Sequence, residues 1–260
     1  IASAGDVNGD GYEDIIAGGD YWEFHLFFGS ADGLSEDSVQ VVTGARDSGF
    51  GEDVSGLGDI NGDGFDDVGA LGEDGDGVVY YGDAEGLLST PTVLEGVGTP
   101  FPAGDLNSDG YADALTVSGG VVAAYFGSAD GLSTAATLEL SISNASEAVG
   151  IGDLNADGHP DLAVAARDDR AVYIFSGAEG GPDAVVDATL TGADSFAYTF
   201  TSSVTGLGDV NGDGADDLMV SDLDWDADVG SVHIFYGQPD TGGEDTGGED
   251  TGGNGDDPGG

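Results

Sequence analysis

Five short segments of the chain carry oxygen-bearing side chains at the same alternating positions, a pattern suited to binding a hard cation. They read GDVNGDGYED from Gly5, GDINGDGFDD from Gly58, GDLNSDGYAD from Gly104, GDLNADGHPD from Gly152 and GDVNGDGADD from Gly208. Each contains the invariant pattern Asp-x-Asn-x-Asp-Gly-x-x-Asp. Calcium prefers carboxylate, amide and carbonyl oxygens, and glycine lets a chain turn sharply around the ion. The sequence therefore predicts five calcium loops.

Each predicted loop offers three kinds of oxygen. Asp, Asn and Asp side chains come from its first, third and fifth positions, the seventh residue offers its backbone carbonyl, and a further Asp stands at the ninth position. With about five protein ligands, water would supply the remainder of the six to eight oxygens that calcium takes. The predicted ligands are Asp6, Asn8, Asp10, Tyr12, Asp14, Asp59, Asn61, Asp63, Phe65, Asp67, Asp105, Asn107, Asp109, Tyr111, Asp113, Asp153, Asn155, Asp157, His159, Asp161, Asp209, Asn211, Asp213, Ala215 and Asp217.

The same residue types also make tight turns without metal, since Asn-Gly and Asp-Gly are preferred in hairpin loops. A turn needs only two such residues, whereas this pattern fixes four oxygen-bearing positions in all five copies. Neighbouring carboxylates repel one another by about 1 kcal/mol per pair even in water, and a bound cation removes that repulsion. We therefore expect up to five calcium ions, bound with an affinity of roughly 0.1 to 1 mM because each loop carries few charged ligands.

The loops recur with a period that predicts the fold. Their first Asp residues stand at positions 6, 59, 105, 153 and 209, and each is followed by an aromatic or apolar segment ending in Gly29, Gly82, Gly127, Gly177 or Gly237. A period near 50 residues with several short strands is typical of propeller blades. In the second unit we expect strands at 50–60, 67–71, 77–81 and 92–94. The predicted fold is an all-β propeller of four-stranded blades, with five repeats visible.

These segments also resemble a known repeat. The loop GDVNGDGYED, followed by a short apolar strand and an aromatic-Gly strand such as VYIFSG, is similar to the FG-GAP repeat of integrin α-subunit propellers. Phe50-Gly51 matches the Phe-Gly of that repeat, but its Gly-Ala-Pro element is not preserved. The resemblance covers residues 1 to about 237. It implies a ring that is seven-bladed when whole, calcium loops on its lower face, and a function in adhesion, protein binding or the support of attached enzymes.

The two ends of the chain differ in composition. Phe50 and Phe200 each precede a loop Asp by nine residues, and in the first unit that offset falls before residue 1. We therefore expect the chain to begin inside a strand, in a ring truncated at its N-terminus. Residues 238–260 repeat TGGED with almost nothing apolar, so we expect a disordered acidic linker after a propeller domain at 1–237. The expected state is a monomer tethered by this tail to a further segment.

The charge of the chain limits its partners. Fifty-two acidic residues against three Arg and no Lys give a formal charge of −49. Nucleic acids and anionic membranes are therefore poor partners, because their phosphates would be repelled. No apolar run approaches the roughly 20 residues that cross a bilayer, so we expect no membrane insertion in this fragment. Millimolar calcium exists outside cells, which favours a secreted or cell-surface protein.

A second surface is predicted at the opposite end of the blades from the calcium loops. All three Arg residues and several aromatic residues fall in connections expected there, namely Tyr21, Trp22, Arg46, Arg167, Arg170 and Trp225. They form a hypothetical binding surface for a protein or glycan ligand, although solvated ion pairs and rim packing explain the same residues. Asp222, Asp224, Asp226 and Asp228 alternate like a calcium loop but lack its turning Gly, so we expect a solvated acidic loop.

No catalytic motif is recognisable in the sequence. There is no Cys, no Lys, no Gly-x-Ser-x-Gly and no His-Glu-x-x-His. We therefore expect no enzyme, and a calcium-binding adhesion or protein-interaction scaffold is the first hypothesis. The alternatives are a carbohydrate-binding propeller, which requires aromatic residues at one loop position in each blade, and a non-catalytic accessory domain of a larger secreted hydrolase.

Overall fold

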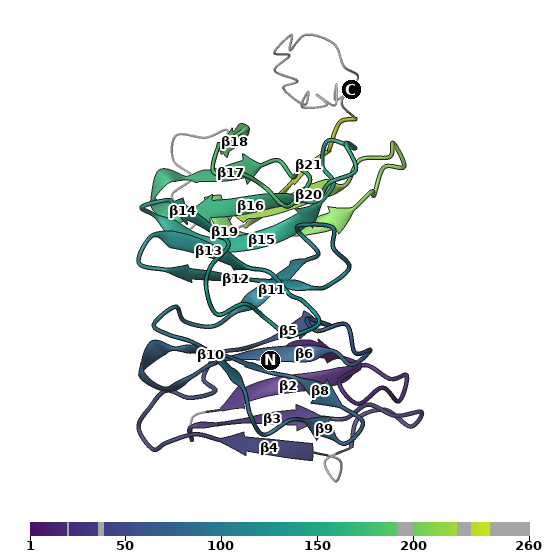
Figure 1. The fold of residues 1–260 in the computed structure, drawn as a ribbon. Coiled ribbons are helices and arrows are strands. Elements are labelled where there is room, and N and C mark those ends of the chain that lie inside the picture. The colour runs from purple at the N-terminus through teal and green to yellow at the C-terminus, as the bar shows by residue number, and fades with distance from the viewer. Residues whose placement is uncertain (20, 36–38, 192–199, 223–229, 240–260) are drawn as a thin grey trace, which may run out of the picture.

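The chain folds as a succession of antiparallel sheets (Figure 1). The computed structural model describes residues 1–19, 21–35, 39–191, 200–222 and 230–239. Within them the regular structure consists of strands and two short 3-10 turns, η1 (Glu73–Gly75) and η2 (Arg167–Asp169). The predicted all-β class is confirmed. The predicted linker at 238–260 falls almost entirely outside the described residues.

Five sheets correspond to the five sequence repeats. The first contains β1 (Ala2–Gly5), β2 (Asp14–Gly19), β3 (Glu23–Phe27) and β4 (Val39–Thr43) in that order. The second contains β5 (Val54–Gly58), β6 (Asp67–Leu71), β7 (Gly77–Tyr80) and β10 (Thr92–Leu94), with the small hairpin β8 (Gly82–Asp83) and β9 (Gly86–Leu87) between its last two strands.

The remaining three sheets repeat this order. The third contains β11 (Phe101–Gly104), β12 (Asp113–Ser118), β13 (Val121–Tyr125) and β14 (Leu138–Ser141). The fourth contains β15 (Ala145–Gly152), β16 (Asp161–Ala166), β17 (Ala171–Phe175) and β18 (Ala188–Thr191). The fifth contains β19 (Phe200–Gly208), β20 (Asp217–Asp222) and β21 (Ser231–Phe235), and has three strands within the described residues.

The strands expected in the second unit are confirmed at 67–71 and 92–94 and nearly so at 77–81. The first strand is shorter than expected, because β5 starts at Val54 instead of Phe50. Gly49 and Gly51 both have positive φ angles, 75° and 72°, so the chain turns at Phe50 before it extends.

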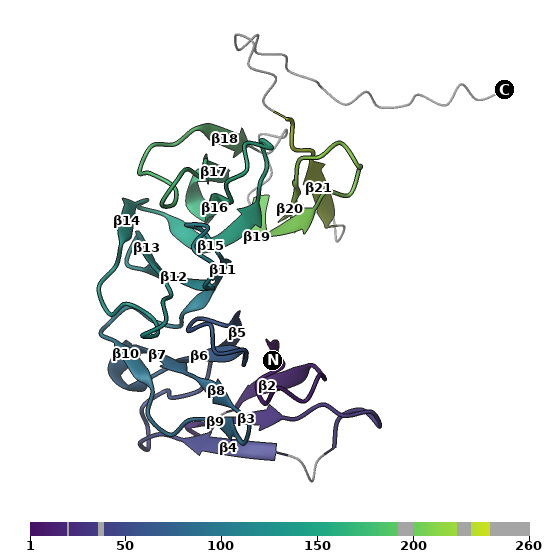
Figure 2. The same ribbon diagram turned by 45° about the vertical axis from the view of Figure 1, so that its right-hand side comes forward.

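The sheets are arranged in an arc (Figure 2). The first strands β1, β5, β11, β15 and β19 contact one another in that order, and the fourth strands lie at the outside of the arc. This radial order of four-stranded sheets is consistent with propeller blades. The arc is open between the first and fifth sheets, so the predicted seven-bladed ring is not seen.

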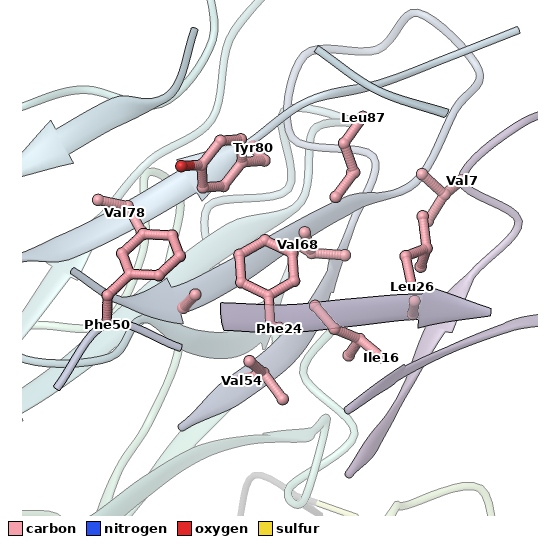
Figure 3. Packing of buried hydrophobic residues seen from close by; sticks show 12 residues of the cluster. Val7, Ile16, Phe24, Leu26, Phe50, Val54, Val68, Val78, Tyr80 and Leu87 are labelled. Atoms are coloured by element: carbon pink, nitrogen blue, oxygen red, sulfur yellow. The ribbon is translucent and has the colours of Figure 1, made fainter. Parts of the chain in front are cut away.

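A hydrophobic core fills each junction between consecutive sheets. At the first junction, Phe24 of β3 packs against Phe50 and Tyr80 of the second repeat, with ring centroids 5.7 and 5.5 Å apart (Figure 3). Similar clusters lie at the other three junctions. The second, third and fourth sheets, which lie between two junctions, therefore bury side chains from both faces, which explains the nearly continuous apolar runs of β12 and β16.

The fifth sheet differs from the first four because, within the described residues, no following sheet covers it. We call Val210, Val232 and Ile234 the open face; their exposed fractions are 55%, 59% and 46%. The apolar residues at the same repeat positions in the earlier sheets pack toward the following sheet. Leu154 is partly buried, and the others are at most 3% exposed: Val7, Ile60, Leu106, Phe24, Val122, Val172, Leu26, Val79, Ala124 and Ile174. The open face is thus equivalent to a sheet junction without a following sheet.

Candidate metal loops

Each predicted calcium loop connects the first and second strands of its sheet. Neighbouring loops lie side by side: a Cβ added to Gly9 would come within 2.7 Å of the Phe65 ring, and one added to Gly62 within 2.6 Å of the Tyr111 ring. Glycine at these positions makes room for the aromatic residue of the next loop. The structure therefore brings consecutive loops together along one end of the arc.

The glycine that precedes each loop forms a β-bulge. Gly5, Gly58, Gly104, Gly152 and Gly208 have φ angles between 67° and 78°, and the strand register shifts immediately before each of them. A bulge with glycine in the left-handed region bends the strand and redirects the chain. It directs the end of the first strand into the loop.

The side chains at the tip of the loop hold its backbone. In the first loop, Asp6 accepts hydrogen bonds from the N–H groups of Asp10 (3.0 Å) and Gly11 (2.8 Å) on its two carboxylate oxygens. Asn8 accepts from the Asp10 N–H at 3.0 Å and donates its side-chain amide to the Asp10 carboxylate at 3.2 Å. The other four loops repeat these bonds.

The ninth residue of the loop has a different environment. Asp14, Asp67, Asp113, Asp161 and Asp217 are at most 1% exposed. One carboxylate oxygen of each accepts the N–H of the loop's second residue, and the other accepts the N–H of the glycine that ends the aromatic segment. These bonds measure 2.7 to 3.0 Å. The ninth Asp therefore joins the loop to the segment that follows the third strand.

The glycine that ends the aromatic segment has no room for a side chain. A Cβ added to Gly29 would collide with the carbonyl oxygen of Glu13, and one added to Gly237 would collide with that of Asp216. Gly82, Gly127 and Gly177 are similarly enclosed by backbone carbonyls. This close approach lets the glycine N–H reach the buried carboxylate, and it explains why the two sequence signals recur together.

Burial raises the pKa of Asp14, Asp67, Asp113 and Asp161. The pKa of Asp67 is raised to about 7 and that of Asp113 to about 6, mainly by desolvation. Two backbone hydrogen bonds oppose each shift, while the neighbouring loop carboxylates add to it; for Asp67 these are Asp63 and Asp59. The pKa values of Asp14 and Asp161 are also raised by burial. Negative charge at the base of the loop is thus costly in the absence of a cation.

The donor chemistry of the loops fits a hard cation, although their geometry is not that of a bound site. Among the described residues, no group of three or more His, Cys, Asp or Glu side chains is arranged to hold a metal ion. The tip oxygens face the loop's own N–H groups, as they do in metal-free turns. Each loop nevertheless offers three carboxylates and an amide oxygen, and the three Arg residues of the chain all lie outside the loops.

The second predicted surface is not one cluster. Arg46 lies over the Trp22 ring, 5.5 Å from its centroid, in connections of the first repeat. Arg167 and Arg170 lie in the connection between β16 and β17 of the fourth sheet, and Tyr21 is 74% exposed. Trp225 falls outside the described residues, as do Asp224, Asp226 and Asp228. Tyr21 and Trp22 lie between the second and third strands of the first sheet. The same connection in the second, third and fourth sheets holds no aromatic residue, so the recurrence required for a carbohydrate-binding propeller is missing there.

Comparisons with known proteins agree with the repeat architecture. The sequence model of the family described as "FG-GAP-like repeat" matches residues 105–164 and 153–220. Integrin alpha-7 of Rattus norvegicus is 34% identical over 160 residues, which cover 54% of this chain and 14% of that protein. Integrin alpha-6 of Homo sapiens is 33% identical over 131 residues (44% and 12%), and integrin alpha-8 of Mus musculus is 31% identical over 143 residues (42% and 13%).

The fold and its loops define an all-β repeat protein with one acidic loop per sheet. Residues 105–220 thus consist of FG-GAP-like repeats, and the similarities support a repeat protein of the integrin α type. It spans only about one seventh of the length of the integrin α relatives. No helix within the described residues is long and apolar enough to cross a membrane.

Proposed function

We propose that this chain is a calcium-binding section of an extracellular β-propeller that serves as an adhesion or protein-interaction scaffold. The observation that carries the proposal is the repetition of one loop conformation with the same four oxygen-bearing side chains in five sheets. The similarity of more than half of this chain to an integrin α chain supports the adhesion role.

In this proposal the tip side chains and the carbonyl of the seventh residue hold the ion, and the ninth Asp completes the site with the lone pairs that its backbone hydrogen bonds leave available. In the first loop these are Asp6, Asn8, Asp10, Tyr12 and Asp14. Bound calcium supplies two positive charges to a loop that carries three negative ones. The raised pKa values of Asp67 and Asp113 support this, because a cation at the loop favours their charged forms.

Calcium should stabilise the folded chain. Because the loops exist only in the folded state, calcium at ten times its dissociation constant adds about 1.4 kcal/mol per site. Thermal unfolding in 10 mM calcium and in excess chelator should therefore differ by many degrees, with magnesium at the same concentration and ionic strength as the control. Equal melting temperatures in all three conditions would contradict calcium binding.

We further propose that additional sheets of the same type complete the propeller. The open face of the fifth sheet supports this, because the equivalent side chains in four other sheets are buried by a following sheet. A photo-crosslinking amino acid at position 232 of the full-length native protein should link to a segment with the same repeat pattern. A crosslink to an unrelated protein, or reaction of the photo-activated group with water and no crosslink, would argue against ring completion.

A further inference from the structure

Two of the four sheet junctions are closed by the same pair of hydrogen bonds at the base of the loops. At the junction of the first and second sheets, Asp66 donates its N–H to the Asp6 carbonyl (3.2 Å), and its carboxylate accepts the Asp6 N–H (2.8 Å). At the junction of the fourth and fifth sheets, Asp216 and Asp153 repeat both bonds at 2.8 and 2.9 Å. In both cases one Asp residue bonds to the backbone N–H and to the backbone carbonyl of a single residue in the preceding loop, Asp6 or Asp153.

Of the other two junctions, one has only the first of these bonds and the other has neither. Ala112 occupies this position at the second junction and still donates its N–H to the Asp59 carbonyl at 3.0 Å, but it has no carboxylate. Pro160 occupies it at the third junction and has neither group, since proline lacks an N–H. The Asp105 carbonyl there accepts a long bond of 3.4 Å from Ser108, and within the described residues no partner is recorded for the Asp105 N–H.

A cleft is present where these groups are missing. It has a volume of about 520 Å³ and is lined by residues that include Pro102, Asp105, Val149, His159 and Pro160. At the two closed junctions the carboxylates of Asp66 and Asp216 cover Gly5 and Gly152, whereas nothing lies within 4 Å of a Cβ added to Gly104.

One further polar atom at the cleft lacks a partner. The Nδ1 atom of His159 is buried and has no hydrogen bond, although His159 lines the cleft. A buried nitrogen without a partner is costly. The cleft is thus lined by His159, whose Nδ1 is unpaired, and by Asp105, whose N–H has no hydrogen-bond partner among the described residues.

We propose that the cleft between the third and fourth sheets binds an extended residue of a protein partner, which takes the place of the missing Asp at position 160. The N–H of that residue donates to the Asp105 carbonyl and its C=O accepts the Asp105 N–H, as the two groups of Asp66 and Asp216 do at their junctions. A guanidinium or ammonium group has no acceptor. A carboxylate has no donor, and the negative charges of Asp105, Asp153 and Asp216 at the cleft repel it.

The apolar parts of Pro102, Val149 and Pro160 suit the carbon atoms that flank an amide. The partner is therefore a neutral, extended peptide segment. This site adds a partner contact to the proposed scaffold and does not require the loops to bind calcium.

Substitutions at position 160 test the site, because they reproduce the other junctions. Pro160→Ala restores the donor found at Ala112, and Pro160→Asp restores both groups found at Asp66. The full chain, labelled with ¹⁵N, is titrated with N-acetylalanine N-methylamide while the Asp105 amide signal is followed by NMR. The shift should be saturable in the wild type, several-fold weaker in Pro160→Ala and absent in Pro160→Asp.

Three controls keep the test specific. Ala112→Asp makes a similar change at a junction without the cleft and should leave the titration unchanged. N-acetyl-N-methylalanine N,N-dimethylamide, which keeps both carbonyls but has no N–H, and sodium acetate, which has no N–H and carries a negative charge, should bind several-fold more weakly. The amide spectrum of each variant reports whether it is folded. Equal shifts in the wild type and Pro160→Asp, or no saturable shift in the wild type, would overturn the proposal.

Discussion

The tip and the base of each acidic loop use the same residue type for different purposes. At the tip, Asp6 and Asp10 are partly or fully exposed and bond to N–H groups of their own turn. At the base, Asp14 is completely buried and bonds to N–H groups on two separate segments. The same division holds in all five repeats. A carboxylate at the tip can exchange its bonds for water or an ion, whereas one at the base has no such alternative.

This contrast shows that an invariant metal-binding pattern can also contain a structural residue. The ninth Asp is predicted to be a calcium ligand, and it also has a structural role, which is visible in its ten hydrogen bonds across the five repeats. It fastens the loop to the end of the third strand. The two roles make different predictions for substitutions at the tip and at the base.

The largest effect is expected at the base of a loop. Asp161→Ala removes a buried carboxylate and leaves the N–H groups of Leu154 and Gly177 without acceptors. Losing hydrogen bonds to a charged group and burying the unpaired donors should lower the free energy of unfolding by about 3 to 5 kcal/mol. Urea denaturation in excess chelator measures this value without any contribution from calcium.

The matched substitution at the tip is Asp157→Ala. It removes acceptors for N–H groups that water can reach, so the metal-free chain should lose no more than about 1 kcal/mol. In calcium the tip variant should also lose the stabilisation that the ion gives to that loop. If both substitutions cost the same in chelator, the distinction between tip and base is wrong.

Much of this architecture can be predicted from the sequence because it is local or periodic. The loop pattern and the aromatic-Gly segments recur together, which gives the number of sheets and the position of β6 and β10 almost to the residue. The alternation of apolar residues gives strands, and the invariant glycines mark positive φ angles.

Contacts between distant residues could not be predicted in this way. The partner of Asp14 is Gly29, fifteen residues later, and no local pattern shows that a carboxylate and an N–H meet across that distance. The hydrogen bonds of Asp66 and Asp216 are further examples, since they join neighbouring repeats. The invariant Gly before each loop did carry a usable signal, because a strand that ends in Gly-Asp suggests a bulge.

The pH dependence of stability should separate the base of the second loop from its tip. Asp67 has a pKa of about 7 in the folded chain and an ordinary value of 3.8 when unfolded. Between these values the unfolded state binds fewer protons, so Asp67 lowers the stability of the metal-free chain as pH rises from about 4 to about 7, and its effect is constant above that range.

Comparison with Asp67→Asn isolates this contribution from that of the other acidic residues. In excess chelator, the stability of the wild type should fall more steeply than that of Asp67→Asn between pH 5 and 7.5, as measured by urea denaturation. Asp63→Asn at the tip should follow the wild-type slope more closely. Parallel curves for the wild type and Asp67→Asn would show that the buried carboxyl group does not retain its proton.

The smallest effect is expected at the fourth position of each loop, where only the backbone conformation affects stability. Gly9, Gly62 and Gly212 have positive φ angles there, and Ser108 and Ala156 adopt the same conformation with φ of 60° and 56°. A residue with a side chain is strained in this region by about 1 to 2 kcal/mol, and replacing it with glycine removes the strain. Part of this stabilisation is lost because glycine also increases the conformational entropy of the unfolded chain. Ser108→Gly and Ala156→Gly should therefore each raise the free energy of unfolding by roughly 0.5 to 1 kcal/mol, with or without calcium. Ser128→Gly, in a turn outside the loops, serves as the control for the entropic cost, and a loss of stability in both loop variants would mean that the tips are not held in this conformation in solution.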